Sequence, residues 1–384
     1  MRVVYISNYF NHHQKPLSDA MYRLLGDEYC FVETSTIPQF RLELGYQVLR
    51  APYVLSYIGN TSHIEKLVNE ADVVIYGEAP LDIIKSRYLS GKLTFRDDES
   101  RYKNPNRFLK WPIYTFKSMV LNKGYLLCAS AYAPIDYLLS GMNPEKCFRW
   151  GYFTKLKQYE EEALMKQKRE QSPQRVSILW AGRLIALKHP EAVVFVAQRL
   201  KQNGYSFIIR VIGSGDLEGH IKSLIEKRGL TDCVDFLGAM PPERVRTEME
   251  NSDIFLFTSD RREGWGAVLN ESMNSGCAVV ADGNIGSVPY LIENGVNGLV
   301  YRSRRWSDLC DKVEWLVTHP KEMNTMGRNA YHSMVKYWNG ETAATNLLAL
   351  SRSILQGEPS PIIQGPCSHA PLLMRRWLGR FRTL

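Results

Sequence analysis

The stretch REGWGAVLNE, which runs from Arg262 to Glu271, organises the interpretation of the whole sequence. It follows the apolar run Asp253–Phe257 and leads into an amphipathic segment that ends at Gly276. This pattern predicts a strand, a glycine-rich turn and then a helix. Glycines in the turn let a ligand approach the backbone closely, and the start of a helix has unpaired N–H groups that suit a phosphate.

Two carboxylates bracket this turn, because Glu263 lies on the turn itself and Glu271 follows about two helical turns later. Neither should face a phosphate, since like charges repel, so hydroxyl groups are their natural partners. A phosphate-binding turn between two carboxylates that accept hydroxyls suits a sugar nucleotide. Taken alone, the stretch equally fits a turn and a solvated helix without a ligand, because strand–turn–helix joints are common.

The composition is that of an ordinary globular protein. The 384 residues predict two domains, with 45% hydrophobic and 23% charged residues. A net charge of +8 suggests a phosphate-bearing ligand, an anionic membrane surface or nucleic acid. The seven cysteines are scattered without a CxxC pair, which supports neither a zinc site nor a disulfide framework. With no signal peptide and no apolar run long enough to span a membrane, we expect a cytoplasmic protein.

Apolar runs alternate with helical patterns in two long blocks, which predicts two parallel α/β sheets. In residues 1–155 strands are expected at Val3–Ser7, Tyr29–Glu33, Asp72–Tyr76, Lys92–Phe95 and Tyr125–Ser130, with helices at Pro16–Leu25, Thr61–Asn69, Pro80–Leu89, Arg107–Leu121 and Ala131–Leu139. In the second block, residues 176–335, strands are expected at Val176–Ala181, Ser206–Ile212, Val234–Leu237, Asp253–Phe257, Ala278–Ala281 and Gly298–Tyr301. A charged linker with helical tendency joins the blocks at residues 156–175, and residues 357–384 are expected to form a flexible, basic tail.

The first block offers candidates for an acceptor site. Ligands of parallel sheets bind beyond the carboxyl ends of the strands, and polar loops follow three of the predicted strands. The first of these loops lacks glycine and carries aromatic and histidine residues, which look like an acceptor surface, although a surface histidine pair is the simpler interpretation of His12 and His13. The charged loop Phe95–Arg101 fits a solvated loop equally well. By edge position the candidates are Asn8, His12, His13, Glu78, Arg96 and Asp97. No histidine lies between residues 63 and 189, which excludes a general-base histidine from the middle of this block.

The second block carries two further motifs on the same edge as Glu263. In AGRLIALKHP, residues 181–190, Arg183 and Lys188 flank the loop after the first strand, and two cations there can neutralise a diphosphate. The glycines of Gly213–Gly219 match a dinucleotide fingerprint only weakly, and a glycine-lined wall of a nucleotide pocket is the simpler interpretation.

Five motifs of this block, in order, resemble the retaining glycosyltransferases of family 4: AGR at 181–183 with Lys188, GSG at 213–215, FLG at 236–238, EGWG at 263–266 with Glu271, and GCAVVA at 276–281. The resemblance implies the α/β architecture called GT-B, in which two Rossmann-like domains face each other across a cleft. It also implies a C-terminal helix that crosses back to the first domain, here residues 336–356. The first block departs from the family, because Asn8–Lys15 replaces its glycine-rich loop and the first-domain histidine often seen near the sugar has no counterpart.

The resemblance also implies roles for individual residues. Arg183 and Lys188 would hold the donor diphosphate, Glu263 would contact the hydroxyls of the transferred sugar, and Glu271 would contact those of the ribose. The amides of the turn would contact the phosphates, and further positions would line the donor site. These donor-binding positions are Gly182, Gly213, Gly215, Leu237, Gly264, Trp265, Gly266, Ala267 and Val268. The family generally needs neither a bound metal nor a cofactor.

The sequence therefore predicts a hexosyltransferase that moves a sugar, with retention, from a UDP- or GDP-sugar to a glycan or lipid-linked acceptor in cell-surface polysaccharide or glycoconjugate synthesis. The basic, aromatic end Leu372–Arg382 can hold the protein at the anionic inner face of a membrane, and nucleic acid is not expected as a partner. Two alternatives remain open at this stage. One is an NAD-dependent oxidoreductase that uses Gly213–Gly219, and the other is a catalytically inactive GT-B subunit that scaffolds a partner enzyme.

Overall fold

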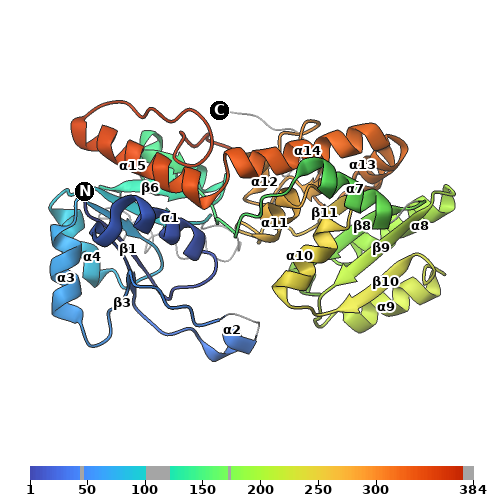
Figure 1. Ribbon diagram of the computed structural model, residues 1–384, viewed down its shortest axis with the longest axis horizontal. Helices are drawn as coiled ribbons and strands as arrows, with labels where there is room; N and C mark the ends of the chain where they lie inside the picture. Colours follow the sequence, from blue (N-terminus) through green and yellow to red (C-terminus); the bar gives the residue numbers. More distant parts are fainter. Residues whose placement is uncertain (44–46, 101–121, 172–173, 375–384) are drawn as a thin grey trace. The chain divides into compact units, whose positions relative to one another are not determined.

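A computed structural model describes residues 1–43, 47–100, 122–171 and 174–374. The chain forms two compact units, each built around a parallel sheet (Figure 1). One unit comprises Met1–Lys155 together with Tyr337–Leu384, and the other comprises Leu156–Lys336. The helix predicted at Arg107–Leu121 and the last ten residues of the predicted tail lie outside the described residues.

The sheet of the first unit has seven strands within the described ranges, in the order β3-β2-β1-β4-β5-β6-β7. Its central strands are runs of apolar, largely β-branched residues that are buried on both faces, as parallel sheets require. The strands are β1 (Val3–Ser7), β2 (Tyr29–Glu33), β3 (Val54–Ser56), β4 (Val73–Tyr76), β5 (Thr94–Asp98), β6 (Tyr125–Cys128) and β7 (Cys147–Arg149). The sequence did not predict β3 or β7, because each is only three residues long and shows no periodicity.

The helices of the first unit include the C-terminal helix of the chain. They are α1 (Lys15–Leu25), α2 (Gln39–Glu43), α3 (Thr61–Glu70), α4 (Asp82–Leu89), α6 (Ala133–Leu138) and α15 (Gly340–Gln356). The Asn339 side chain caps α15 by accepting a hydrogen bond from the Thr342 amide at 2.9 Å. Helix α15 packs along α1, where a Cβ on Gly340 would lie 2.6 Å from the Pro16 carbonyl oxygen (Figure 1). The helix expected to cross back therefore does belong to the first unit.

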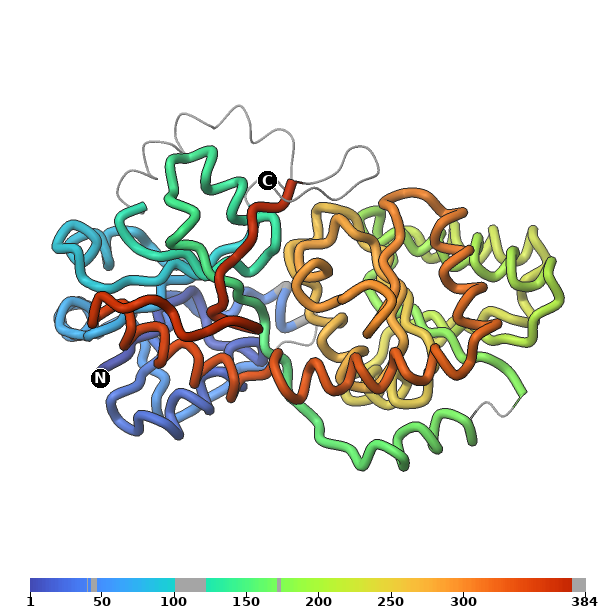
Figure 2. The backbone as a smooth tube through the Cα atoms, turned by 90° about the horizontal axis from the view of Figure 1, so that it is seen from above, coloured from blue at the N-terminus to red at the C-terminus, as the bar shows by residue number. Residues whose placement is uncertain are grey.

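Part of the predicted flexible tail is packed against the first unit, which corrects the expectation for residues 365–370. Cys367 is fully buried, and its amide donates to the Arg149 carbonyl at 2.8 Å. The Arg149 amide in turn donates to the Ser368 carbonyl at 2.8 Å, and the Ala370 amide donates to the Cys147 carbonyl at 3.0 Å. Figure 2 shows the red C-terminal segment running back along the first unit after α15. The segment thus covers β7, the edge strand, whose backbone groups would otherwise lack partners.

The sheet of the second unit has six parallel strands in the described part of the chain, in the order β10-β9-β8-β11-β12-β13. They are β8 (Val176–Ala181), β9 (Phe207–Ile212), β10 (Val234–Gly238), β11 (Ile254–Phe257), β12 (Ala278–Asp282) and β13 (Gly298–Tyr301). The helices are α7 (Glu161–Gln171), α8 (Ala192–Gln202), α9 (Glu218–Lys227), α10 (Pro242–Glu250), α11 (Val268–Asn274), α12 (Val288–Leu291), α13 (Trp306–Thr318) and α14 (Pro320–Lys336). Every strand of this sheet was predicted within one or two residues.

Helix α7 shows why the charged segment 156–175 is more than a linker. Its Leu164 and Met165 are buried, and Lys168 is buried as well. The Lys168 ammonium donates to the Met249 carbonyl at 3.0 Å and to the Ser252 carbonyl at 2.5 Å, at the end of α10. A lysine so placed binds the exposed carbonyls of a helix end. The segment is therefore part of the second unit.

Within the described residues, none of the helices combines the length and apolar character that a membrane crossing requires.

Candidate active site

The candidate site lies at the carboxyl edge of the second sheet, where the chain order reverses. Strand β8 lies between β9 and β11, so the loops that follow β8 and β11 leave this edge side by side. Open parallel sheets bind ligands at such a switch point. The two loops contain the predicted residues Arg183, Lys188 and Glu263.

The glycines at 213 and 215 pack the loop after β9 against the loop after β8. A Cβ on Gly213, at φ 134°, would lie 1.8 Å from the Gly182 carbonyl oxygen. A Cβ on Gly215, at φ 155°, would lie 2.6 Å from the Leu184 carbonyl oxygen. Only glycine permits both the backbone conformation and the contact. The close approach that these glycines allow is thus occupied by the chain itself, which argues against the dinucleotide fingerprint.

A buried threonine joins the loops after β8 and β11. The Thr258 hydroxyl accepts a hydrogen bond from the Trp180 indole at 2.8 Å and donates to the Lys188 carbonyl at 2.7 Å. The Asp260 amide donates to the Leu187 carbonyl at 3.0 Å. These bonds fix the backbone of Lys188 relative to the turn that follows β11.

Lys188 and Glu263 form an ion pair across the two loops, and their side chains are only 17% and 16% exposed. The pair is held in place because the Glu263 amide donates to the Asp260 carbonyl at 2.9 Å. Arg183 differs, since it is exposed and makes no side-chain hydrogen bond or ion pair with any described residue. The two predicted cations are therefore unequal: one already has a carboxylate partner, and the other does not.

The turn before α11 is built on Gly266 and Trp265. Gly266 has φ 80°, and a Cβ there would lie 2.3 Å from the Phe257 ring. Trp265 is buried, its indole donates to Asn270 Oδ1 at 2.8 Å, and its carbonyl accepts from the Ser287 hydroxyl at 2.5 Å. The Trp265 ring is thus an anchor for the turn, so its predicted contact with a donor can involve only its backbone.

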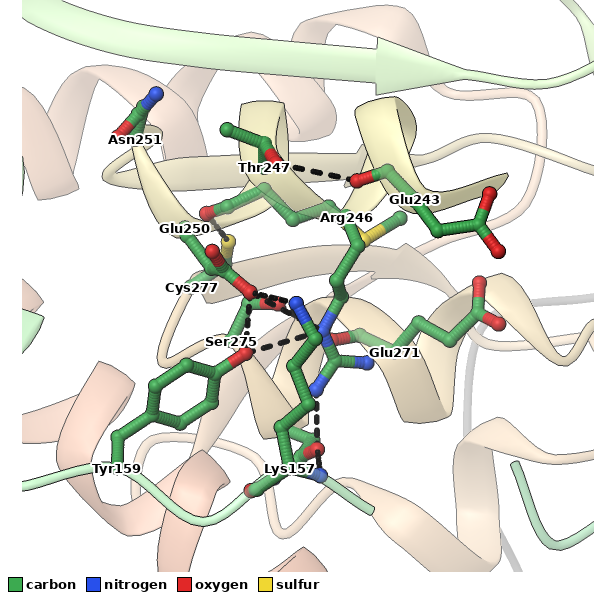
Figure 3. A network of polar contacts seen from close by, with 12 residues as sticks. Lys157, Tyr159, Glu243, Arg246, Thr247, Glu250, Asn251, Glu271, Ser275 and Cys277 are labelled. Atoms are coloured by element: carbon green, nitrogen blue, oxygen red, sulfur yellow. Dashed lines mark hydrogen bonds and ion pairs between the residues drawn. The ribbon is translucent and has the colours of Figure 1, made fainter. Parts of the chain in front are cut away.

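Glu271 lies on α11 with a carboxylate that makes no hydrogen bond or ion pair within the described ranges. Burial raises the pKa of Glu271, and the nearby positive charge of Arg246 opposes that rise. Figure 3 shows the Arg246 guanidinium, from α10, beside the Glu271 side chain. A partly buried carboxylate without a hydrogen-bond partner lowers the stability of the fold, because its charge is desolvated without compensation. A ligand that donates a hydrogen bond to the carboxylate would offset this cost.

A polar network that the sequence did not reveal lies behind Glu271 (Figure 3). Arg246 donates to Asn274 Oδ1 and, at 3.3 Å, to the Tyr159 hydroxyl. The Asn274 amide group pairs with the main chain of Lys157 through two bonds of 2.9 Å. Glu250 accepts from the Lys157 ammonium at 2.7 Å and from the Tyr159 hydroxyl. The sequence spacing places Arg246 and Glu250 one turn apart on a helix, but it does not reveal their shared partner Tyr159, which is 87 and 91 residues away from them.

In the first unit, the structure brings together some of the acceptor-side candidates. Asn8 Nδ2 donates to Glu78 Oε2 at 3.0 Å, across the carboxyl ends of β1 and β4. The rings of His12 and His13 lie 4.0 Å apart. Burial, together with the charges of His12 and Arg41, lowers the pKa of His13 to about 3, so that ring is neutral at physiological pH.

The other two candidates in the first unit, Arg96 and Asp97, were expected in a loop. Instead β5 continues to Asp98, and successive side chains of a strand point to opposite faces. Arg96 Nη2 donates to Asp98 Oδ2 at 2.7 Å, whereas Asp97 accepts from the Tyr5 hydroxyl at 2.5 Å. Burial raises the pKa of Asp97 to about 7 despite that bond. Arg96 and Asp97 therefore do not form one site.

The described residues contain no group of three or more His, Cys, Asp or Glu side chains arranged to hold a metal ion. The two groups that sequence reasoning overlooked near Lys188 are His189 and its partner Asp260, which are joined by a hydrogen bond.

The residues at this edge of the second sheet lie within a region that is similar to known proteins. The family model for glycosyl transferases group 1 matches residues 161–333. That range contains every donor-side position predicted from the sequence.

Among curated proteins, the chain is 35% identical over 130 residues to the amylovoran biosynthesis glycosyltransferase AmsK of Erwinia amylovora. The aligned region covers 33% of this chain and 32% of AmsK. It is 28% identical over 177 residues to the alpha-D-kanosaminyltransferase of Streptomyces kanamyceticus, and the aligned region covers 46% of this chain and 45% of that protein. The chain thus spans less than half the length of these curated relatives.

Among solved structures, HepE of Anabaena in complex with UDP superposes with a TM-score of 0.68 at 14% identity, over 93% of this chain and all of that one. At this identity the likeness concerns the fold, and it confirms the predicted GT-B class with its two Rossmann-like domains.

Proposed function

We propose that the chain is a retaining glycosyltransferase that moves a hexose-type sugar from a nucleotide-sugar donor to a glycan or lipid-linked acceptor. The observation that carries the proposal is the arrangement at one sheet edge of the Lys188–Glu263 ion pair and the unpaired carboxylate of Glu271. The match to the group 1 glycosyl transferases over the same residues supports it.

The donor diphosphate is assigned to Arg183 and Lys188. Arg183 is exposed and has no partner among the described side chains, so it is available to a phosphate. Lys188 is paired with Glu263, and a bound diphosphate would share its ammonium. Charge-assisted hydrogen bonds from two cations stabilise a diphosphate and continue to do so as it leaves. This gives the site a means of stabilising the leaving group with its own side chains.

The hydroxyl groups of the donor are assigned to the two carboxylates. Glu271 would accept from the ribose, because its carboxylate lacks a partner and carries the charge that makes such a bond strong. Glu263 would accept from the transferred sugar, next to the reacting carbon. The amides of Gly264–Val268, and the wall made by Gly182, Gly213, Gly215 and Leu237, complete the proposed donor site.

The reaction proposed is a substitution with retention. The bond between the anomeric carbon and the diphosphate oxygen breaks, and the acceptor oxygen forms its bond to that carbon on the same face. The acceptor proton passes to the departing phosphate oxygen, so no protein base is required. The step needs neither a redox cofactor nor a metal in the proposal, because Arg183 and Lys188 supply the positive charge.

The acceptor is proposed from the relatives by sequence and from the net charge of the chain. AmsK, a relative by sequence, is named for amylovoran biosynthesis, which favours a polysaccharide or lipid-linked intermediate. The net charge of +8 favours a site near anionic lipids. Peripheral binding at the inner membrane face through Leu372–Arg382 is part of the proposal, although most of that segment lies outside the described residues.

The test is transfer by the full chain from UDP- and GDP-sugars to acceptors in a membrane extract, with the anomeric configuration of the product determined by NMR. We expect a product whose anomeric configuration is the same as in the donor. Product formation should be lost in Glu263→Gln and kept in the control Glu243→Gln, because Glu243 is exposed on α10. An inverted product would contradict retention. Thermal stabilisation by NAD, with none from nucleoside diphosphates, would replace the proposal with an oxidoreductase, and inactivity with every donor would favour a scaffold.

A further inference from the structure

His189, which follows Lys188 directly, has an unusual backbone conformation. It lies in the left-handed region with φ 51°, which non-glycine residues seldom adopt. Such strain persists only when surrounding contacts hold it. The residue stands between the donor-side loop that ends at Lys188 and the start of α8.

Both ring nitrogens of His189 meet carboxylates. Nδ1 lies 2.7 Å from Glu191 Oε1, and Nε2 lies 3.3 Å from Asp260 Oδ2. An ionised carboxylate can only accept hydrogen bonds, so both nitrogens must carry protons and the ring is positively charged. Burial alone lowers the pKa of His189, but the bonds to Asp260 and Glu191 outweigh it and raise the pKa to about 9. The side chain is 13% exposed and packs against the Trp306 ring of α13 at 5.7 Å.

The other charged groups near this ring each act on one of the two acids or on the ring itself, whereas His189 bonds to both acids. Asp260 also accepts from Arg262 at 2.7 Å, and Arg304 acts on Glu191. Asp282, at the end of β12, also faces the ring, and burial raises the pKa of Asp282 to about 6. The histidine is the group that bonds to Asp260 and Glu191 together, and so ties the turn after β11 to the start of α8.

We propose that His189 is a positioning residue for transfer: its charged ring, shared between Asp260 and Glu191, holds the loop of Lys188 against the turn of Glu263. The connection is short, because the Asp260 amide bonds to the Leu187 carbonyl and the Asp260 carbonyl accepts from the Glu263 amide. Movement of Asp260 therefore moves both members of the Lys188–Glu263 pair. The inference rests on the function proposed above.

The decisive variant is His189→Asn. Asparagine tolerates the left-handed conformation, so the backbone is kept, while its short side chain cannot reach both acids. His220→Asn is the matched control, because His220 is exposed on α9. We expect His189→Asn to lower kcat by at least ~10-fold, since small misplacements of reacting groups are costly. Affinity for the nucleoside diphosphate should fall by less than kcat does, because Lys188 is displaced while Arg183 and Glu271 keep their positions. A kcat within about 2-fold of wild type would overturn the inference.

A second measurement does not depend on activity. In histidine-labelled full chain, the His189 ring signal, assigned by its absence from His189→Asn, should titrate near pH 9. Titration near the ordinary value of about 6.5 would mean that the ring does not bridge two ionised acids, and would overturn the inference. If the wild type transfers no sugar while His189 titrates near pH 9, the proposed function fails and the bridge itself stands.

Discussion

Replacing Glu271 with glutamine should make the protein more stable and less able to bind its donor. In the ligand-free structure the Glu271 carboxylate is partly buried and has no partner among the described residues. Glutamine keeps the shape and removes the charge, so the unfavourable desolvation disappears. The same change removes the charge-assisted hydrogen bond proposed for the ribose.

The two effects have separate magnitudes. Relief of an unsatisfied, partly buried group should raise the free energy of unfolding by about 1 kcal/mol, or about 2–4 °C in Tm for a domain of this size. Loss of the charge-assisted bond should cost about 1.5–3 kcal/mol of binding, or ~10- to 100-fold in Kd. The stability gain should fade as pH falls, because the pKa of Glu271 is raised and the wild-type carboxyl is itself neutral at low pH.

The assay combines thermal unfolding between pH 4 and 8 with calorimetric titration of UDP and GDP. Glu243→Gln serves as the control, since Glu243 is exposed on the neighbouring helix α10 (Figure 3). A variant that is less stable at pH 8 would show that the carboxylate already has a stabilising partner. Unchanged nucleotide affinity would defeat the ribose role.

Three further changes test the site's construction. Gly213→Ala should destabilise the protein by more than about 2 kcal/mol in urea, because its Cβ would lie 1.8 Å from the Gly182 carbonyl oxygen; an unchanged midpoint would contradict that contact. Glu263→Gln should cost about 1–3 kcal/mol, because Lys188, 17% exposed, loses its ion-pair partner; equal stability would show that the pair contributes nothing. His189→Asn should lower the free energy of unfolding by at most about 3 kcal/mol, because folding raises the pKa of His189 to about 9. The difference from wild type should be largest below about pH 6.5 and should disappear as the pH rises through about 9, and a difference that is constant with pH would refute the charged ring.

The second sheet could be predicted from the sequence because its strands are buried on both faces. Runs such as Ile254–Phe257 and Ala278–Asp282 are continuous apolar segments between turn residues, and parallel strands place the following loops on one edge. Arg183, Lys188 and Glu263 lie on that edge as predicted. What the sequence could not reveal is that Lys188 is already paired with Glu263.

The features that were missed depend on contacts between distant residues. The bond from His189 to Asp260 spans 71 residues, and the pairing of Asn274 with Lys157 spans 117. The strand-like contact of Cys367 with Arg149 joins the end of the chain to an edge strand. A local pattern of glycine, proline and serine predicts flexibility, yet it contains no information about an unpaired sheet edge elsewhere.

The proposed function requires the loops after β8 and β11 to bind the nucleotide part of a sugar donor. The most direct measurement is amide hydrogen exchange of the full chain with and without saturating UDP or GDP. We expect slower exchange with one of these nucleotides at residues 182–188 and 263–271. The proposed function would be contradicted if neither nucleotide protected these loops, or if NAD protected residues 213–219 instead.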